Sequence, residues 1–147
     1  MVLNLDVQTA FDSMDHVRIV RALKKEGWRE EAVLQVQADL TELRARASVR
    51  GVSATEWVDY RHGGRQGGAD TPALWRSLLD SVLRPCVRAW EEAGLGHRHG
   101  APGEEMSLQL LVWADNVWIL GRSWSEAALM ARAATEHLER AGMKWKA

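Results

Sequence analysis

Two short apolar runs near the end of the chain, Leu108–Trp113 and Val117–Leu120, are separated only by Ala114-Asp115-Asn116. Because Asp and Asn tolerate the backbone geometry of tight turns, this pattern predicts a β-hairpin with an acidic residue at its bend. A third apolar run, Val2–Val7, predicts a short buried strand with Asp6 near its end. Any fold of this chain has to place these three strands around the helices that are predicted between them.

Two helices and a hairpin are predicted after the first strand. Ser13 or Asp15 can cap the first helix, and residues 30–43 carry an apolar stripe at helical spacing. Over residues 43–50 apolar and polar side chains alternate, which predicts a half-exposed strand. A turn then leads to a partner strand over residues 57–60. These elements precede the longest predicted helix.

Two further helices flank the late hairpin. Thr71 followed by Pro72 predicts the start of a long helix with the Thr hydroxyl as its cap, and Pro85 is expected to kink or split that helix. The capping box Ser123–Glu126 starts the last helix, and residues 143–145 indicate the beginning of an edge strand. This order predicts the α+β class, as a ferredoxin-like βαββαβ arrangement with an extra helix and a β-hairpin inserted.

The composition limits the classes of function. At 147 residues, with 46% hydrophobic and 27% charged residues, the chain suits one domain with a buried core. A formal net charge of −1 gives no sign of the basic surface that is typical of nucleic-acid-binding proteins. Cys86 is the only cysteine, so we expect no internal disulfide and an intracellular protein. No apolar run approaches the roughly 18 residues that span a bilayer, so no membrane partner is expected.

Three motifs occur along the chain in an informative order. The first runs from Asp6 to His16 and contains Ala10-Phe11-Asp12. The second begins with Arg65-Gln66-Gly67, and the third is Trp113-Ala114-Asp115-Asn116. Together they resemble the palm of a reverse transcriptase, most nearly of the non-LTR retroelement type. Residues 141–146 resemble the start of the family's next motif.

The resemblance implies a fragment of an RNA-directed DNA polymerase. Such an enzyme transfers deoxynucleotides from their triphosphates onto a DNA primer paired with an RNA template, with two Mg²⁺ or Mn²⁺ ions as cofactors. Residues 1–147 would form a single palm domain that lacks fingers and thumb. Those parts would lie before Met1 and after Ala147 in a larger polyprotein.

The resemblance also implies two sets of site residues. The set expected to act in catalysis and to bind metal lies on the first strand and the late hairpin: Asp6, the backbone carbonyl of Val7, Asp115 and Asn116. Of these, Asp6, Val7 and Asp115 would be the metal ligands. The set expected to contact the incoming nucleotide comprises Phe11, Arg65, Gln66 and Gly67. Phe11 would crowd the 2′ position of the sugar and so favour deoxynucleotides.

The chain departs from the family pattern in two motifs. Asn116 stands where the family has a second Asp, and Gly68-Ala69 replaces an Asp-Pro pair after the second motif. An amide offers an oxygen ligand but no negative charge to offset two dications, so the affinity for metal should fall. We therefore expect weak catalysis at best from the isolated chain.

Two alternatives belong to other functional classes. The chain is either a catalytically inert retroelement remnant that acts at most as an RNA- or protein-binding module, or an unrelated small α/β binding module. The neutral Asn116 favours the first alternative. The second alternative requires all three motifs to coincide by chance in the family's order.

Overall fold

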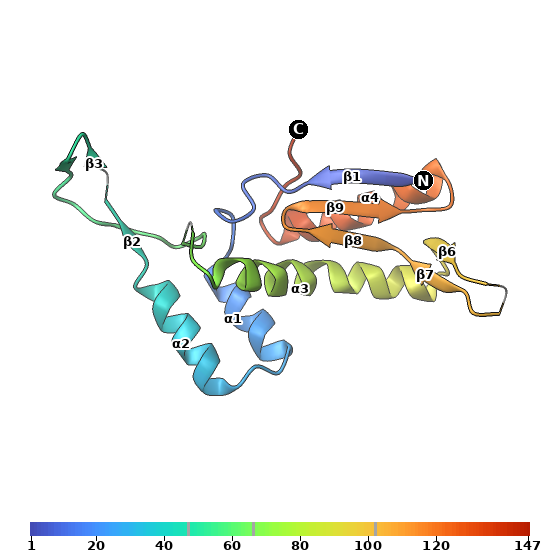
Figure 1. Cartoon of the computed structure of the whole chain (residues 1–147), viewed down its shortest axis with the longest axis horizontal. Coiled ribbons are helices and arrows are strands. Elements are labelled where there is room, and N and C mark those ends of the chain that lie inside the picture. The colour runs from blue at the N-terminus through green and yellow to red at the C-terminus, as the bar shows by residue number, and fades with distance from the viewer. Residues whose placement is uncertain (47, 66, 102) are drawn as a thin grey trace. The chain divides into compact units, whose positions relative to one another are not determined.

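The structure is a computed structural model that describes residues 1–46, 48–65, 67–101 and 103–147. In these ranges the chain forms four helices and small antiparallel sheets, which confirms the α+β class (Figure 1). The described residues form two compact units. We call Met1–Ala10 with Leu79–Ala147 the sheet unit, and Phe11–Leu78 the helical unit. A single domain over residues 1–147 stays a prediction.

The centre of the sheet unit is a three-stranded antiparallel sheet with the order β1-β9-β8 (Figure 1). β1 spans Val2–Asp6, β8 spans Leu110–Trp113 and β9 spans Asn116–Leu120. The predicted first strand and the predicted late hairpin are therefore both confirmed. β9 lies in the middle, so it joins the start of the chain to the late hairpin in one sheet.

Apolar alternation determines which face of this sheet is covered. Residues that lie opposite one another in an antiparallel pair share a face, so Leu3 and Leu5 lie beside Ile119 and Val117. Val117 and Ile119 are completely buried. The helix α4, Trp124–Arg140, contacts β1 and β9 and buries Ala127, Met130, Ala134 and Leu138. Burial of these side chains supplies the main driving force for this unit.

The long helix α3 spans Thr71–Glu92, and its part from Leu79 onward belongs to the sheet unit. The Cys86 thiol of this part donates to the carbonyl of Ala133 in α4 at 3.9 Å. Of the two outcomes expected at Pro85, the split is wrong, because α3 continues through this residue, and the kink stays a prediction. Leu83 and Cys86 are buried on either side of Pro85, and this packing holds the helix together.

The start of α3 also differs from the prediction. The Thr71 hydroxyl does not cap the helix but donates to the carbonyl of Arg65 at 2.8 Å. The amides of Ala73 and Leu74 instead donate to the carbonyl of Asp70, so the chain turns into the helix one residue earlier than expected. Among the described residues, no helix is long and apolar enough to cross a lipid bilayer.

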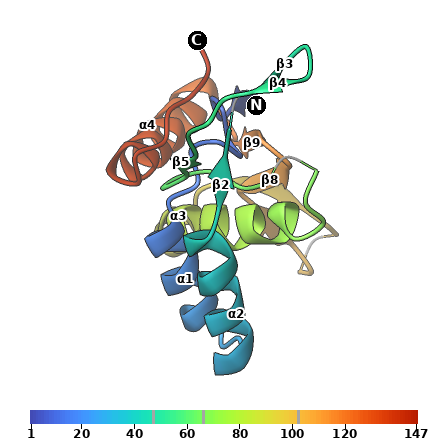
Figure 2. The same cartoon turned by 90° about the vertical axis from the view of Figure 1, so that its left-hand side faces the viewer.

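The helical unit consists mainly of α1, His16–Lys25, and α2, Glu30–Thr41, which lie side by side (Figure 2). Asp15 is the N-cap of α1, and its side chain accepts a hydrogen bond from the amide of Arg18 at 2.8 Å. Both predicted helices are confirmed, although α2 ends two residues before the predicted boundary. The core of this pair contains Ile19, Ala22, Leu23, Val33 and Leu40.

The predicted hairpin after α2 forms in short pieces. β2, Arg44–Ala45, pairs with β5, Val58–Asp59, while β3, Ser48–Val49, pairs with β4, Val52–Ser53. The continuous strand predicted over residues 43–50 is not confirmed, since its described residues pair in two separate ladders. Residue 47 lies outside the described residues.

Gly63 joins the loop before α3 to the segment before α1. Its amide donates to the carbonyl of Met14 at 2.8 Å, and its carbonyl lies 2.8 Å from Nε2 of His16. Its φ angle is +89°, and a Cβ atom there would lie 3.2 Å from the Cα and the carbonyl oxygen of Asp12. Only glycine meets both requirements without strain.

We predict that Gly63→Ala lowers the free energy of unfolding by about 2–3 kcal/mol, because left-handed strain adds to a backbone clash. Gly27→Ala is the matched control, since Gly27 has a φ of +80° but a Cβ added there would meet nothing within 4 Å. In urea denaturation, the free energy of unfolding of the control should fall by only about 1 kcal/mol. Equal losses in the two variants would show that the contact with Asp12 is unimportant.

The capping box at the start of α4 is only half formed. Ser123 accepts a hydrogen bond from the Glu126 amide at 3.2 Å, as predicted. The Glu126 carboxylate instead accepts from the Gly96 amide at 2.7 Å and from Nε of Arg122 at 2.9 Å. The hydrogen bond from Gly96, aided by Arg122, lowers the pKa of the Glu126 carboxyl. Glu126 therefore ties α4 to the loop that follows α3.

Because its pKa is lower in the folded state, ionised Glu126 stabilises the fold at neutral pH, and this contribution is lost as the pH falls through the folded pKa. We predict that Glu126→Gln lowers the free energy of unfolding by about 1 kcal/mol at neutral pH and by less under acidic conditions. Glu136→Gln is the control, since its ion pair with Arg140 is exposed. Urea denaturation at neutral and acidic pH measures the free energy of unfolding of each variant. An equal decrease for Glu126→Gln at both pH values would contradict the prediction.

Candidate active site

The structure brings the predicted catalytic residues together at one end of the sheet. The register of β1 and β9 places Asp6 opposite Asn116. One residue further along, the Val7 amide donates to the carbonyl of Asp115 at 2.9 Å. All four residues of the predicted catalytic and metal-binding set therefore lie within one strand end and one adjacent turn.

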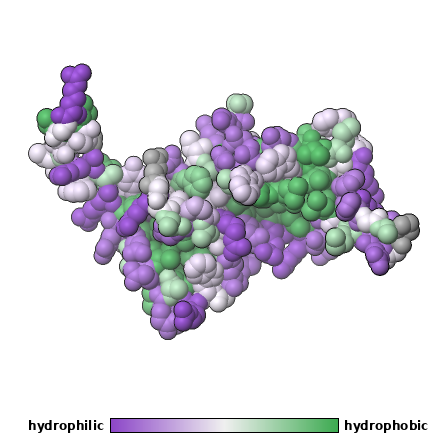
Figure 3. Space-filling view, viewed as in Figure 1, coloured by the Kyte–Doolittle hydropathy of each residue, from purple (hydrophilic) through white to green (hydrophobic). Residues whose placement is uncertain are grey.

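The register also determines which face of the sheet carries this site. Asp6 and Asn116 alternate with Leu5 of β1 and with the buried Val117 of β9, so they lie on the face turned away from α4. Leu111 and Trp113 of β8 share that face and are 48% and 75% exposed. Figure 3 shows hydrophobic side chains gathered over these strands. The Asp6 carboxylate is thus at the edge of an open, partly apolar surface.

Backbone strain is concentrated near the same residues. Among the described residues, three that are not glycine have a positive φ: Thr9, Arg50 and Ala114. Ala114, with a φ of 53°, forms the bend directly before Asp115, and Thr9, with a φ of 47°, follows Asp6 by three residues. Such conformations cost about 1–2 kcal/mol each and occur preferentially at functional sites. Two of the three lie beside the predicted catalytic set.

A cation already faces one of the carboxylates. Nζ of Lys146 lies 3.4 Å from Oδ2 of Asp6, and the Lys146 amide donates to the Asp6 carbonyl at 2.7 Å. The side chains of Lys146 and Asp6 are 67% and 34% exposed, so the pair contributes little to stability. Its importance is electrostatic, because a metal ion at Asp6 would compete with the Lys146 ammonium group. No sequence pattern indicates this pair, beyond the edge strand predicted just before Lys146.

The predicted ligands are oxygen atoms, which suit a hard divalent cation, but they carry few negative charges. Carboxylate, amide and carbonyl oxygens are the ligands that Mg²⁺ and Mn²⁺ prefer. In the part of the chain that the structure describes, no group of three or more His, Cys, Asp or Glu side chains could hold a metal ion. Asn116 is a neutral residue, so the predicted set offers two carboxylates, those of Asp6 and Asp115.

The predicted nucleotide-binding residues belong to the helical unit. Phe11 is half-buried, with its ring centroid 6.0 Å from that of Trp75 and an interplanar angle of 59°. The Phe11 carbonyl accepts from the Gly64 amide at 2.9 Å, so the loop before α3 lies beside the first motif. Arg65 and Gly67 are exposed in this loop. Gln66 lies outside the described residues, so the prediction for it stays untested.

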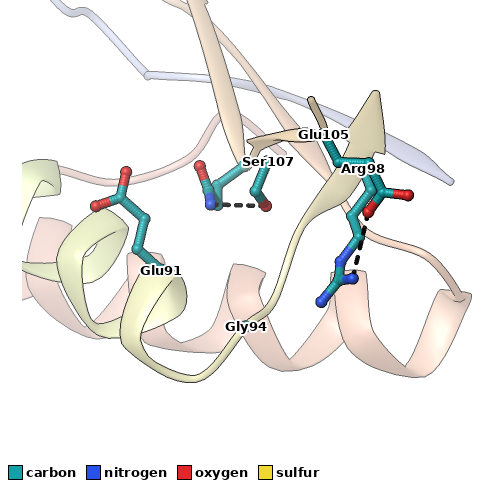
Figure 4. A pocket seen from close by; sticks show the side chains of 6 residues that line it. Glu91, Gly94, Arg98, Glu105 and Ser107 are labelled. Carbon is teal, nitrogen blue, oxygen red and sulfur yellow. Dashed lines mark hydrogen bonds and ion pairs between the residues drawn. The ribbon is translucent and has the colours of Figure 1, made fainter. Parts of the chain in front are cut away.

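A separate hollow of about 490 Å³ lies elsewhere in the sheet unit, between the end of α3 and a two-stranded ribbon (Figure 4). The ribbon consists of β6, His97–His99, and β7, Met106–Leu108. An ion pair of 3.4 Å between Arg98 and Glu105 lines the hollow. It contains no predicted site residue, so it is distinct from the carboxylate site.

Comparisons with known proteins give one relative and no family model. No protein-family model matches the chain. The chain is 31% identical over 119 residues to a retrovirus-related Pol polyprotein from the type-1 retrotransposable element R2 of Popillia japonica. The alignment covers 81% of this chain and 16% of the polyprotein, so the chain spans only a small part of that relative's length. This similarity supports a retroelement-related origin for the chain.

Proposed function

We propose that this chain is a fragment of a reverse transcriptase whose sheet unit is the catalytic part of a palm. Its reaction would be the transfer of deoxynucleotides onto a DNA primer paired with an RNA template, and this activity is weak or lost in the isolated chain. The observation that carries the proposal is the register of β1 and β9, which places Asp6 opposite Asn116 and beside the bend that holds Asp115.

The strand order supports a ferredoxin-like palm. The Val7 amide faces β9, whereas the Gln8 amide donates to the carbonyl of Lys144 at 2.8 Å. Successive amides of a strand point to opposite edges, so the segment after α4 lies along the other edge of β1, where Trp145 forms an isolated bridge with Val7. Extension of this bridge into a fourth strand would complete the order of a ferredoxin-like sheet.

Each residue of the proposed site has a distinct role. When bound, Mg²⁺ or Mn²⁺ would activate the 3′-hydroxyl of the primer and hold the triphosphate. Asp6, Asp115 and the Val7 carbonyl would hold the metal, and Asn116 would add a neutral ligand. The Lys146 ammonium would have to move away from Asp6. These features reduce the electrostatic attraction for a dication without removing the oxygen donors.

The residues of the helical unit would handle the nucleotide. The flat ring of Phe11 would exclude a 2′-hydroxyl, and Arg65 would contact phosphate through its guanidinium group. Gln66 and Gly67 would contact the incoming nucleotide, where glycine lets the backbone approach closely. The Thr71 hydroxyl supports this loop through its hydrogen bond to the Arg65 carbonyl.

Metal binding tests the proposal directly. We predict that Asn116→Asp raises the affinity for Mn²⁺ roughly tenfold, because it restores a negative charge beside Asp6 and Asp115. Asp6→Asn should abolish measurable binding in isothermal titration calorimetry. Asp80→Asn is the control, since it removes a carboxylate of the same unit that is paired with Arg84 on α3. Binding that Asp6→Asn leaves unchanged would refute a metal site at this carboxylate.

A second candidate function is an inert remnant, which the neutral Asn116 and the Lys146–Asp6 pair favour. Primer extension on poly(rA) with an oligo(dT) primer distinguishes the two. If the chain is an impaired enzyme, the substitution Asn116→Asp should raise its activity by roughly the same factor as its affinity for Mn²⁺. A remnant should stay inactive even though the same variant binds Mn²⁺ more tightly.

A further inference from the structure

The helical unit carries an exposed arm that the proposed catalytic chemistry does not use. We define the arm as residues 44–46 and 48–61, which contain β2, β3, β4 and β5. Large hydrophobic side chains cover it, with exposed fractions that are high for a protein surface: Val49 69%, Val52 76%, Trp57 56%, Val58 63% and Tyr60 45%. Exposed apolar groups at this density indicate an interaction surface.

The charge of the arm is opposite to that of the rest of the chain. It carries four basic residues, Arg44, Arg46, Arg50 and Arg61, but only two acidic residues, Glu56 and Asp59. Asp59 is paired with Arg44 at 3.0 Å. The chain as a whole has a formal net charge of −1, so the positive charge is concentrated locally. A partner with negative charges would be attracted here and repelled elsewhere.

Arg46 and Trp57 form a stacked pair. The Cζ atom of Arg46 lies 4.9 Å from the ring centroid of Trp57, within the range of a cation–π interaction. The guanidinium group lies over the indole ring, while more than half of Trp57 stays exposed. An exposed aromatic ring beside guanidinium groups is suited to stack on a nucleobase while the cations contact phosphate.

We propose that the arm binds single-stranded nucleic acid, with Trp57 and Tyr60 stacking on bases and Arg46, Arg50 and Arg61 contacting phosphates. Single strands fit better than a duplex because a duplex hides the faces of its bases. An acidic peptide would match the charge but would leave the aromatic rings without a stacking partner. The proposal does not depend on the metal site, since the residues that carry it all belong to the helical unit.

Fluorescence anisotropy with a labelled oligo(U) of about 12 nucleotides tests this proposal. The assay contains EDTA, so failure of the metal site cannot affect the result. Trp57→Ala should weaken binding roughly tenfold, and Tyr60→Ala should weaken it by a similar factor. Trp124→Ala is the matched control, because Trp124 is 58% exposed but belongs to α4 in the sheet unit. It should bind like the wild type.

Further variants separate stacking from charge and from misfolding. Trp57→Phe retains an aromatic ring and should weaken binding less than Trp57→Ala. Arg46→Gln should remove about one phosphate contact, so the slope of the logarithm of the affinity against the logarithm of the salt concentration should become shallower by about one. The melting temperatures of all variants should match the wild type, since these side chains are exposed. Unchanged binding by Trp57→Ala and Tyr60→Ala, or equal affinity for a duplex or for poly-Glu, would overturn the proposal.

Discussion

The pairing of β1 with β9 is the interaction on which the rest of the candidate site depends. It places Leu3 and Leu5 beside Ile119 and Val117 on the face that α4 covers, and this burial fixes the register. A slip by one residue would turn Asp6 toward α4 and expose the apolar residues. The apolar alternation that stabilises the sheet is therefore also what brings Asp6 and Asn116 to its open face.

The electrostatics of this face oppose the binding of a dication. Asn116 removes a negative charge that a dication would need, and Lys146 supplies a positive charge that already faces Asp6. Neither side chain affects the buried face of the sheet, because both lie outside the core. The fold of the sheet is thus independent of the charge at its open face.

Much of the fold could be predicted from local patterns. Short apolar runs and the turn signal at Asp115 predicted β1 and the β8–β9 hairpin, and helical spacing with caps at Asp15 and Ser123 predicted the helices. Local patterns failed where tertiary contacts determine the structure. Packing around Pro85 keeps α3 continuous. The Glu126 carboxylate accepts a hydrogen bond from the Gly96 amide and does not complete the capping box. The ferredoxin-like strand order predicted that the strand end at Asp6 lies beside the turn at Asp115, whereas their role as metal ligands was expected only from the family resemblance. The contact between Asp6 and Lys146 depends on long-range strand pairing, which no local pattern encodes.

Paramagnetic broadening tests most directly whether one strand end and one turn form a single cation site. Substoichiometric Mn²⁺ is added to the ¹⁵N-labelled chain, and the loss of each amide signal is measured. We expect the amide signals of Asp6, Val7, Asp115 and Asn116 to disappear first, together with that of Lys146. Strongest broadening at other carboxylates, such as Glu104 and Glu105, or uniform broadening along the chain, would contradict a shared cation site.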